Sequence, residues 1–376
     1  MEITCTLPLN GNNIANDTLE WSRCGDAMII SRAVNAFFVT ALVGLVMFGA
    51  LGGRPARADD GAAIIMYHRF GENDFPSTNV RLEQLEAHIK ELTTGGYTVM
   101  AVPEIVRRLR AGETFDEKTV GITIDDAYLS VLTEAWPRFK RAGFPFTVFV
   151  ATDPVDKNYS RYMSWAQLKE LAASPLVSIG SQTAAHLHMI DTTPERNAAD
   201  LEKAQARFQD QLGFKPDLIA YPYGEFDGAA IATVKEAGFI AGFGQHSGAF
   251  GPGDDIFRLP RFAMNENYGD VARLKTAASA LPIPVSDFDP ADTVVAPDNN
   301  PPLIGFTLPD SMPRADEINC FSNHEGKLLV EHLGPRIEVR MTRKLPQGRT
   351  RMNCTMPSGP AGEVRFRWLG KLFYVK

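Results

Sequence analysis

The sequence predicts an α/β protein that carries a small all-β domain at its C-terminus. From residue 62 to about residue 280, short continuous apolar segments alternate with helical patterns, which is typical of buried parallel strands connected by helices. Beyond residue 303, apolar and polar residues alternate one by one, and this is the period of strands with one solvated face. Repeated strand–helix units of this number form either a barrel or an open parallel sheet.

The elements of the first part follow from the apolar segments and from helix start signals. Strands are expected at 62–70, 97–102, 119–127, 145–153, 176–183, 217–224 and 240–245. Helices are expected between them at 81–95, 103–112, 128–142, 164–174, 193–213 and 228–238. Ser164 and Gln167 form a capping-box pattern. Thr193, before Pro194 and Glu195, supplies an N-cap, a proline at the first helical position and a first-turn acid.

Residues 1–58 are expected to direct export. Twenty-one uncharged residues, 33–53, are followed at 56–58 by Ala-Arg-Ala, which has the small-x-small form of a signal-peptidase site. Cleavage there would start the mature chain at Asp59. Because the apolar run is also close to the ~20 residues that span a bilayer, an uncleaved inner-membrane anchor is the alternative. Both alternatives place the protein in the periplasm or cell envelope.

The rest of the chain divides into three segments. Residues 59–280 are expected to form the strand–helix domain, and 281–302, rich in proline and aspartate, are interpreted as a linker. Residues 303–376 are expected to form the β domain, with strands at 303–308, 327–333, 336–343, 349–356 and 363–375. This domain holds Cys320 and Cys354, which an oxidising compartment would join in a disulfide. Two buried thiols are the alternative.

The charge of the chain limits its partners. The formal net charge is −7 at pH 7, and no block rich in lysine or arginine interrupts it. This balance argues against a general affinity for nucleic acid or for anionic membranes. The membrane contact that the sequence allows is through the apolar run at 33–53.

Two carboxylates stand at the end of an apolar strand. The segment GITIDDAY places Asp125 and Asp126 at the C-terminal end of the strand expected at 119–127. Carboxylates are rarely buried without a pairing group or a metal ion. Capping of a helix that begins near Tyr128 is one alternative, but it accounts for one aspartate better than for both.

The following strands add metal-binding groups at the same edge. His186 comes just after the strand expected at 176–183, and Tyr223 lies at the end of the strand expected at 217–224. A carboxylate, an imidazole and a further nitrogen or oxygen donor suit Zn²⁺ or another divalent ion. The sequence therefore predicts a divalent metal site at the strand ends.

These segments resemble the signatures of the polysaccharide deacetylases, the carbohydrate esterase group typified by nodulation chitooligosaccharide deacetylases. ITIDDAYLS is similar to the TFDDG signature, IGSQTAAHLHM to the H-[ST]-x-x-H element, and AYPYG to the third motif. IIMYHRF and RLPRFAMNE also resemble segments of one exported branch. The motifs span roughly residues 62–270, so the C-terminal part lies outside the resemblance.

The resemblance implies a distorted (β/α) barrel and hydrolysis of N-acetyl groups on a glycan that contains N-acetylglucosamine. By motif position, Asp125 would be the general base. A divalent ion, expected to be Zn²⁺, would be held by Asp126, His186 and Gln182. The residues implied to bind substrate are Tyr128, Pro222, Tyr223 and Arg261.

Three positions differ from the family pattern. Gln182 stands where the first histidine ligand is expected, and Ala220 stands where an arginine is expected. No leucine-x-histidine element follows RLPRFAMNE to supply the general acid. His68 and His246 lie near expected strand ends and are the candidates for that acid. His188 is a candidate metal ligand, because residues two apart in an extended segment face the same way.

Two other functions compete with the deacetylase. The substitution at Gln182 favours a catalytically impaired protein that binds carbohydrate or takes part in envelope assembly on the same scaffold. A two-carboxylate glycoside hydrolase requires carboxyl groups that face each other across roughly 5–10 Å, and the adjacent Asp125 and Asp126 match this requirement poorly. An esterase that acts on O-acetyl groups is a variant of the first function.

Overall fold

Parallel strands form the centre of the protein, as the continuous apolar segments require. The computed structural model describes residues 58–359 and 365–376, so the predicted export segment at 33–53 lies outside the described residues. In spatial order the main sheet runs β11 (Ala241–Phe243), β10 (Leu218–Ala220), β9 (Val177–Ser181), β8 (Phe146–Val150), β7 (Thr119–Asp125), β2 (Ala62–Tyr67) and β12 (Ala249–Phe250). Neighbours in this order are parallel, except that β12 is antiparallel to β2. Two short strands complete the sheet: β13 (Phe262–Ala263) pairs with β2, and β5 (Thr98–Val99) with β7.

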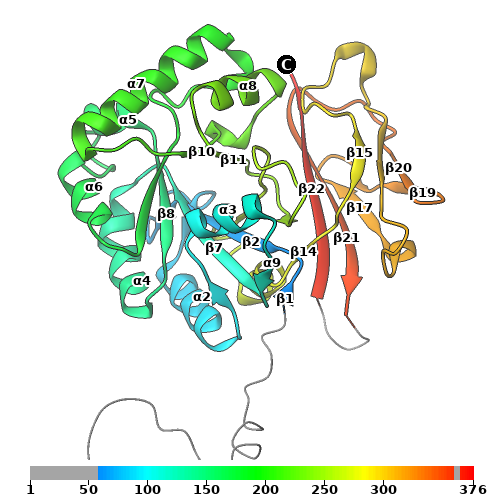
Figure 1. Cartoon of the computed structure of the whole chain (residues 1–376), viewed down its shortest axis with the longest axis horizontal. Coiled ribbons are helices and arrows are strands. Elements are labelled where there is room, and N and C mark those ends of the chain that lie inside the picture. The colour runs from blue at the N-terminus through cyan, green and yellow to red at the C-terminus, as the bar shows by residue number, and fades with distance from the viewer. Residues whose placement is uncertain (1–57, 360–364) are drawn as a thin grey trace, which may run out of the picture. The chain divides into compact units, whose positions relative to one another are not determined.

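Helices follow most of these strands and form a layer outside the sheet (Figure 1). They are α2 (Leu82–Thr94), α3 (Val102–Ala111), α4 (Trp136–Ala142), α5 (Thr152–Asp156), α6 (Trp165–Ala172), α7 (Pro194–Leu212), α8 (Gly228–Glu236) and α9 (Val271–Ala278). The alternation of parallel strands with outer helices confirms the expected distorted (β/α) barrel. Its edge strands β11 and β12 are not paired with each other, so the barrel is open on that side.

The core lies between the strands and this outer layer. Ile65, Ile122 and Val148, from three adjacent strands, are fully buried in one cluster with Leu85 of α2 and Phe139 of α4. Full burial of a side chain of this size stabilises the fold by roughly 1.5–3 kcal/mol relative to exposure. These strands are mostly apolar on both faces, as the sheet requires once helices and barrel interior cover both, and the threonines among them, such as Thr123 and Thr147, are buried too.

Several elements differ from the sequence prediction. The helix expected at 128–142 begins only at η1 (Val131–Ala135), a π-helical turn that continues into α4. Its start is delayed because Asp126 and Ala127 adopt positive φ angles of 72° and 54°, which a helix excludes. Helix α5 occupies part of a segment that was predicted as strand, and α9 was not predicted at all. The start signal for α9 is nevertheless present, since Asp270 accepts a hydrogen bond from the Arg273 N–H at 2.7 Å.

The C-terminal part forms two further sheets, mostly antiparallel. One runs β14 (Leu281–Pro282), β22 (Arg365–Val375), β21 (Gly348–Ser358), β17 (Asn319–Ser322) and β18 (Gly326–Lys327). The other runs β15 (Ser286–Asp289), β16 (Ile304–Thr307), β20 (Arg336–Arg340) and β19 (Leu329–Leu333). The segment 281–302, interpreted as a linker, therefore contributes β14 and β15 to these sheets. Its prolines and aspartates end short strands rather than form an extended connection.

Cys320 and Cys354 face each other on β17 and β21 and form a disulfide. The barrel and the C-terminal sheets belong to one compact unit. Within residues 58–359 and 365–376, no helix combines the length and apolar character needed to cross a bilayer.

The remaining short elements are β1 (Ala58–Asp59), β3 (Arg69–Phe70), β4 (Asn79–Val80), β6 (Phe115–Asp116), η2 (Met189–Asp191), η3 (Pro222–Gly224), η4 (Pro297–Asn299) and η5 (Ala315–Glu317).

Candidate active site

The polar residues singled out in the sequence follow the C-terminal ends of parallel strands. His68 comes directly after β2, Asp125 ends β7, Gln182 follows β9, and Tyr223 follows β10. Because these strands are parallel neighbours, their ends meet at one edge of the barrel, where loops gather functional groups. Five of the chain's candidate residues line one cavity there, of about 400 Å³. Its lining residues are His68, Thr78, Asp126, Tyr128, Ala151, Pro154, Tyr162, His186, Tyr223, Gln245 and Arg349.

Asp125 lies behind the cavity-lining residues His68 and Gln245, completely buried in an ion pair with Arg261. The two guanidinium NH groups reach the two carboxylate oxygens at 2.6 and 2.9 Å. The second oxygen, Oδ2, also lies 3.4 Å from Gln245 Nε2 and 3.9 Å from His68 Nε2. Burial alone would raise the pKa of Asp125. The positive charge of Arg261, and to a smaller extent the interactions with His68 and His186, hold that pKa below its usual value. Asp125 is therefore a carboxylate at neutral pH.

Asp126 and His186 face each other across the cavity. Asp126 Oδ1 lies 3.6 Å from His186 Nε2. Burial lowers the pKa of His186, partly opposed by the charges of Asp126 and Asp125, so the imidazole is neutral at pH 7, the form that binds metal ions. Among the described residues, no group of three His, Cys, Asp or Glu side chains could hold a metal ion. A third donor must therefore come from another residue type.

Gln182 is the nearest donor of another type, and its amide orientation can be assigned from its contacts. The side chain is fully buried, and its Oε1 accepts a hydrogen bond from the Asp126 N–H at 3.3 Å. Its Nε2 is buried without a partner. Turning the amide over would set two donors against each other, so the oxygen faces Asp126. A carbonyl oxygen has a second lone pair, and Gln182 therefore fits a cation at Asp126 and His186 as a weak third donor.

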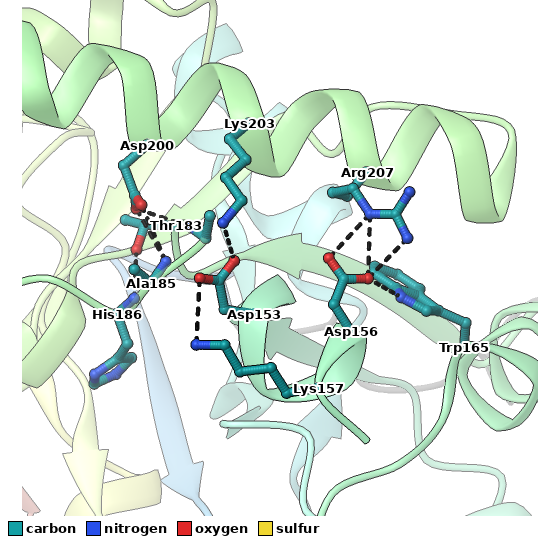
Figure 2. A network of polar contacts seen from close by, with 11 residues as sticks. Asp153, Asp156, Lys157, Trp165, Thr183, Ala185, His186, Asp200, Lys203 and Arg207 are labelled. Atoms are coloured by element: carbon teal, nitrogen blue, oxygen red, sulfur yellow. Dashed lines mark hydrogen bonds and ion pairs between the residues drawn. The ribbon is translucent and has the colours of Figure 1, made fainter. Parts of the chain in front are cut away.

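The loop that carries His186 is held by Asp200 of α7 (Figure 2). The Asp200 carboxylate accepts hydrogen bonds from the N–H groups of Ala184 and Ala185, at 2.9 to 3.2 Å. Thr183 Oγ1 accepts a further bond from the His186 N–H at 3.1 Å. Thr183 and His186 both have positive φ angles, 66° and 56°, a conformation that costs free energy for non-glycine residues. These bonds hold the strained loop and direct the His186 ring away from Asp200.

Tyr223 forms the opposite wall of the cavity. It has a φ of 59° within the turn η3, and the residue as a whole is 36% exposed. The ring stacks on His188, with centroids 3.8 Å apart and planes within 14°, and its edge meets His186 at 4.5 Å. Pro222 begins the same turn. The tyrosine ring thus presents part of its surface to the cavity while it packs against a predicted metal ligand.

Four sequence predictions for individual residues are corrected by these positions. Arg261 was expected to contact substrate, but it is fully buried and neutralises Asp125 instead. Pro222 is buried and shapes the turn rather than facing the cavity. His188 does not join His186 as a ligand, because the positive φ of His186 breaks the extended segment and Glu225 takes the His188 Nδ1 at 2.9 Å.

His246 is the fourth correction. It was a candidate general acid, but it is buried and does not line the cavity. Burial, together with the positive charge of Lys371, lowers its pKa to about 3. An imidazole that stays neutral at working pH cannot donate the proton of an imidazolium. Of the two candidates, His68 is the one beside Asp125.

Sequence reasoning missed several residues that shape the site. Asp200 lies within a helix and carries no local motif that marks it as a loop anchor. Gln245 and Arg349 line the cavity from the end of β11 and from β21. Gln245 could have been found as the polar residue that ends the strand expected at 240–245. Arg349 could not, because its place depends on how the C-terminal sheets pack on the barrel.

Comparisons with known proteins agree with this geometry. The polysaccharide deacetylase family matches residues 112–242. A Bacillus subtilis (strain 168) protein named "Putative polysaccharide deacetylase YxkH" is 26% identical over 202 residues, covering 54% of this chain and 71% of that protein. The poly-beta-1,6-N-acetyl-D-glucosamine N-deacetylase of Staphylococcus aureus (strain MSSA476) is 23% identical over 217 residues, covering 54% and 73%.

A solved structure extends the comparison to the fold. The structure of IcaB from Ammonifex degensii aligns with a TM-score of 0.52 and 26% identity, covering 59% of this chain and 98% of that chain. The alignment does not extend over the remaining 41% of this chain. Residues 112–242 of the barrel, with the motifs at its strand ends, are thus similar to the polysaccharide deacetylase family.

Proposed function

We propose that the protein is a metal-dependent hydrolase that removes N-acetyl groups from a glycan containing N-acetylglucosamine. The observation that carries the proposal is that Asp126, His186 and His68 line one cavity, with Asp125 directly behind His68. An ionised carboxylate, a ligand pair and a second imidazole are the groups that amide hydrolysis requires. The relatives named as poly-beta-1,6-N-acetyl-D-glucosamine N-deacetylases support the same substrate class.

Hydrolysis of the acetamide breaks its C–N bond, adds a water oxygen to the acyl carbon and returns one proton to the nitrogen. Asp125 takes the proton from the attacking water, for which its low pKa keeps it ionised. His68 donates a proton to the departing amine, since it is the cavity-lining imidazole next to Asp125. The products are acetate and a free amino sugar. Arg261 stays behind the carboxylate and fixes its orientation.

Asp126, His186 and the Gln182 oxygen would hold the divalent ion, which we expect to be Zn²⁺. When bound, such an ion supplies polarisation of the acetamide carbonyl and of the attacking water. Tyr223, Tyr128 and Tyr162 line the cavity around this point. Aromatic side chains offer large, rigid apolar faces with a polar tip, which suits the pyranose ring of a substrate.

Release of acetate from β-1,6-linked N-acetylglucosamine oligomers by the purified full chain tests the proposal. Asp125→Asn should lower kcat by about 10²–10⁴-fold, the usual contribution of a general base. Asp210→Asn is the matched control, since Asp210 is an exposed aspartate of α7 that pairs with Arg207. Full turnover by Asp125→Asn would rule out the assigned role.

A second function is favoured by one observation. The Gln182 oxygen is already engaged by the Asp126 N–H, so the chain has a weaker ligand set than carboxylate with two imidazoles. A protein that binds N-acetylglucosamine oligomers on this scaffold without hydrolysing them would show saturable binding in the presence of a chelator. Acetate release that depends on added Zn²⁺ would exclude this alternative.

We also propose that the protein is exported to the periplasm or cell envelope. The proposal rests on the apolar run at 33–53 and on the Ala-Arg-Ala sequence at 56–58. Expression in a Gram-negative host followed by fractionation and mass measurement tests it. A periplasmic chain that starts at Asp59 would indicate cleavage, whereas a full-length chain in the membrane fraction would indicate an anchor. Full-length protein in the cytoplasm would contradict both.

A further inference from the structure

One wall of the cavity comes from outside the barrel. Arg349 lies on β21 of the C-terminal sheets and lines the same cavity as His68, Asp126 and His186. It lies well beyond residues 112–242, which the family match covers. The site is therefore built from two parts of the chain, and the C-terminal part contributes a charged side chain.

The contacts of Arg349 are with the turn that carries Tyr223. Its NH1 donates a hydrogen bond to the Tyr223 backbone oxygen. Its Nε lies 3.5 Å from Oε1 of Glu225, a carboxylate whose side chain is only 4% exposed. The other oxygen of Glu225 is 2.9 Å from His188 Nδ1. A buried carboxylate requires such partners, so Arg349 and His188 together satisfy Glu225.

This arrangement fixes the Tyr223 ring. The backbone of Tyr223 is in the left-handed region, with a φ of 59°, which the surrounding contacts must stabilise. Arg349 holds the backbone carbonyl of Tyr223 by a hydrogen bond. The Tyr223 ring stacks on His188, whose orientation is fixed by its contact with Glu225. Removing Arg349 would remove the bond to the Tyr223 carbonyl and one of the two partners of Glu225, the residue that orients His188.

The C-terminal sheet that carries Arg349 is itself fixed to the barrel. Tyr374, the cross-strand neighbour of Arg349, donates a hydrogen bond to Asp191 of η2 at 3.2 Å. The rings of Trp368 and Phe262 pack edge to face, with their centroids 5.2 Å apart. The strand pair that carries Arg349 is thus held to the barrel by contacts of Tyr374 and Trp368.

We propose that Arg349 is a positioning residue of the deacetylase site, and that through it the C-terminal β domain holds Tyr223 in place to bind the sugar ring of the substrate. The choice of an N-acetylglucosamine glycan as ligand rests on the proposed function. The placement of Tyr223 by Arg349 does not, and it can be measured without substrate. The competing explanation is that Arg349 only joins the two parts of the chain.

The first measurement is the NMR spectrum of the histidine ring carbons in the full chain. Arg349→Ala should shift the ring signals of His186 and His188, since both rings contact Tyr223. Arg340→Ala is the matched control, because Arg340 pairs with Glu331 and Glu338 in the other C-terminal sheet. Unchanged His186 and His188 signals in Arg349→Ala would overturn the proposal. If Arg349→Ala does not fold, Arg349→Lys, which keeps the charge but not the two-point contact, is measured in its place.

The second measurement is a double-mutant cycle on the Kd of a β-1,6-linked N-acetylglucosamine pentasaccharide, with chelator present. Arg349→Ala should weaken binding about tenfold, the scale of one hydrogen bond to a charged group, and Arg349→Lys should restore part of it. In a Tyr223→Ala background the same change should have no further effect. Losses that multiply would show that Arg349 acts independently of the Tyr223 ring and would overturn the proposal. Wild-type protein that binds the pentasaccharide but releases no acetate once Zn²⁺ is supplied would contradict the proposed hydrolysis alone.

Discussion

Arg261 and Asp125 form a bidentate ion pair in which both side chains are completely buried. The arginine also donates from Nε to the Gly244 carbonyl at 2.8 Å and from NH1 to Thr123 Oγ1 at 3.2 Å. Each guanidinium nitrogen therefore has an acceptor. The pair keeps a charged carboxylate beside the cavity, where burial without a partner would neutralise it.

Breaking this pair should affect stability and pH dependence together. Arg261→Met leaves a buried carboxylate without its partner, and removal of one member of a buried pair costs about 3–5 kcal/mol of unfolding free energy. Urea unfolding measures this loss. Arg138→Met, which removes the surface pair with Glu86 and Glu134, should cost less than about 1 kcal/mol. Equal losses in the two variants would contradict the structure.

The sign of the pH effect follows from the direction of the shift. The pKa of Asp125 in the folded protein lies below its ordinary value of 3.8. The stability that the pair contributes is thus fully present above pH 3.8 and is lost as the pH falls through the lower, folded-state pKa. In Arg261→Met, burial raises the pKa of Asp125 and is opposed only by His68 and His186, so the acidic limb of the kcat/KM profile should move to higher pH. An unmoved limb would show that Asp125 does not control it.

Substituting each of the two candidate general acids, His68 and His246, in turn should show which of them donates the proton. His68→Asn should lower kcat by about 10²–10⁴-fold, since it removes the proton donor beside Asp125. His246→Asn should leave kcat within a few-fold of the wild type, because His246 is buried away from the cavity and its pKa of about 3 keeps it neutral. Acetate release at saturating substrate measures both. The reverse result would restore His246 as the acid.

Restoring an imidazole at position 182 should strengthen metal binding. Gln182→His replaces a weak amide donor with a ligand that zinc prefers, and we expect the Kd for Zn²⁺ to fall by roughly tenfold or more, as a change in ligand type implies. Competition with a chromophoric chelator measures it without substrate. Gln211→His, on the surface of α7, is the control and should not alter the high-affinity site. Equal affinities would show that residue 182 does not face the ion.

The sequence could predict those parts of the site that depend on a short stretch of neighbouring residues, but not those that depend on how the side chains pack. The strand ends were predictable, because continuous apolar segments stop at Asp125 and at Gln182, and parallel strands bring such ends together. The roles of Arg261 and Pro222 were not, because a motif gives the position of a side chain along the chain but not whether it faces the cavity or the core. Positive φ angles at Thr183 and His186 also left no sequence mark, and they decide where His188 lies.

Removing Asp200, which holds the loop that carries His186, should weaken metal binding although Asp200 itself is not a proposed ligand. Asp200→Ala leaves the N–H groups of Ala184 and Ala185 without their acceptor. Loss of a residue that orients a ligand typically costs 10–100-fold in metal affinity, and we expect a change of about that size in the Kd for Zn²⁺. Asp210→Ala, on the same helix, pairs only with surface groups and should leave the Kd unchanged. If both variants bind Zn²⁺ like the wild type, Asp200 does not position His186.

The Cys320–Cys354 disulfide should stabilise the part of the chain that carries Arg349. It joins β17 to β21 across a sequence separation of 34 residues, and a loop of this length corresponds to about 3–4 kcal/mol in the chain-entropy estimate. The variant with both cysteines changed to serine should therefore unfold at lower urea concentration, and reductant should lower the midpoint of the wild type but not of the variant. Because Arg349 lies on β21, partial unfolding of this sheet should weaken pentasaccharide binding before the barrel loses its helical circular dichroism. Simultaneous loss of both signals would show that the barrel and the C-terminal sheets unfold as one cooperative unit.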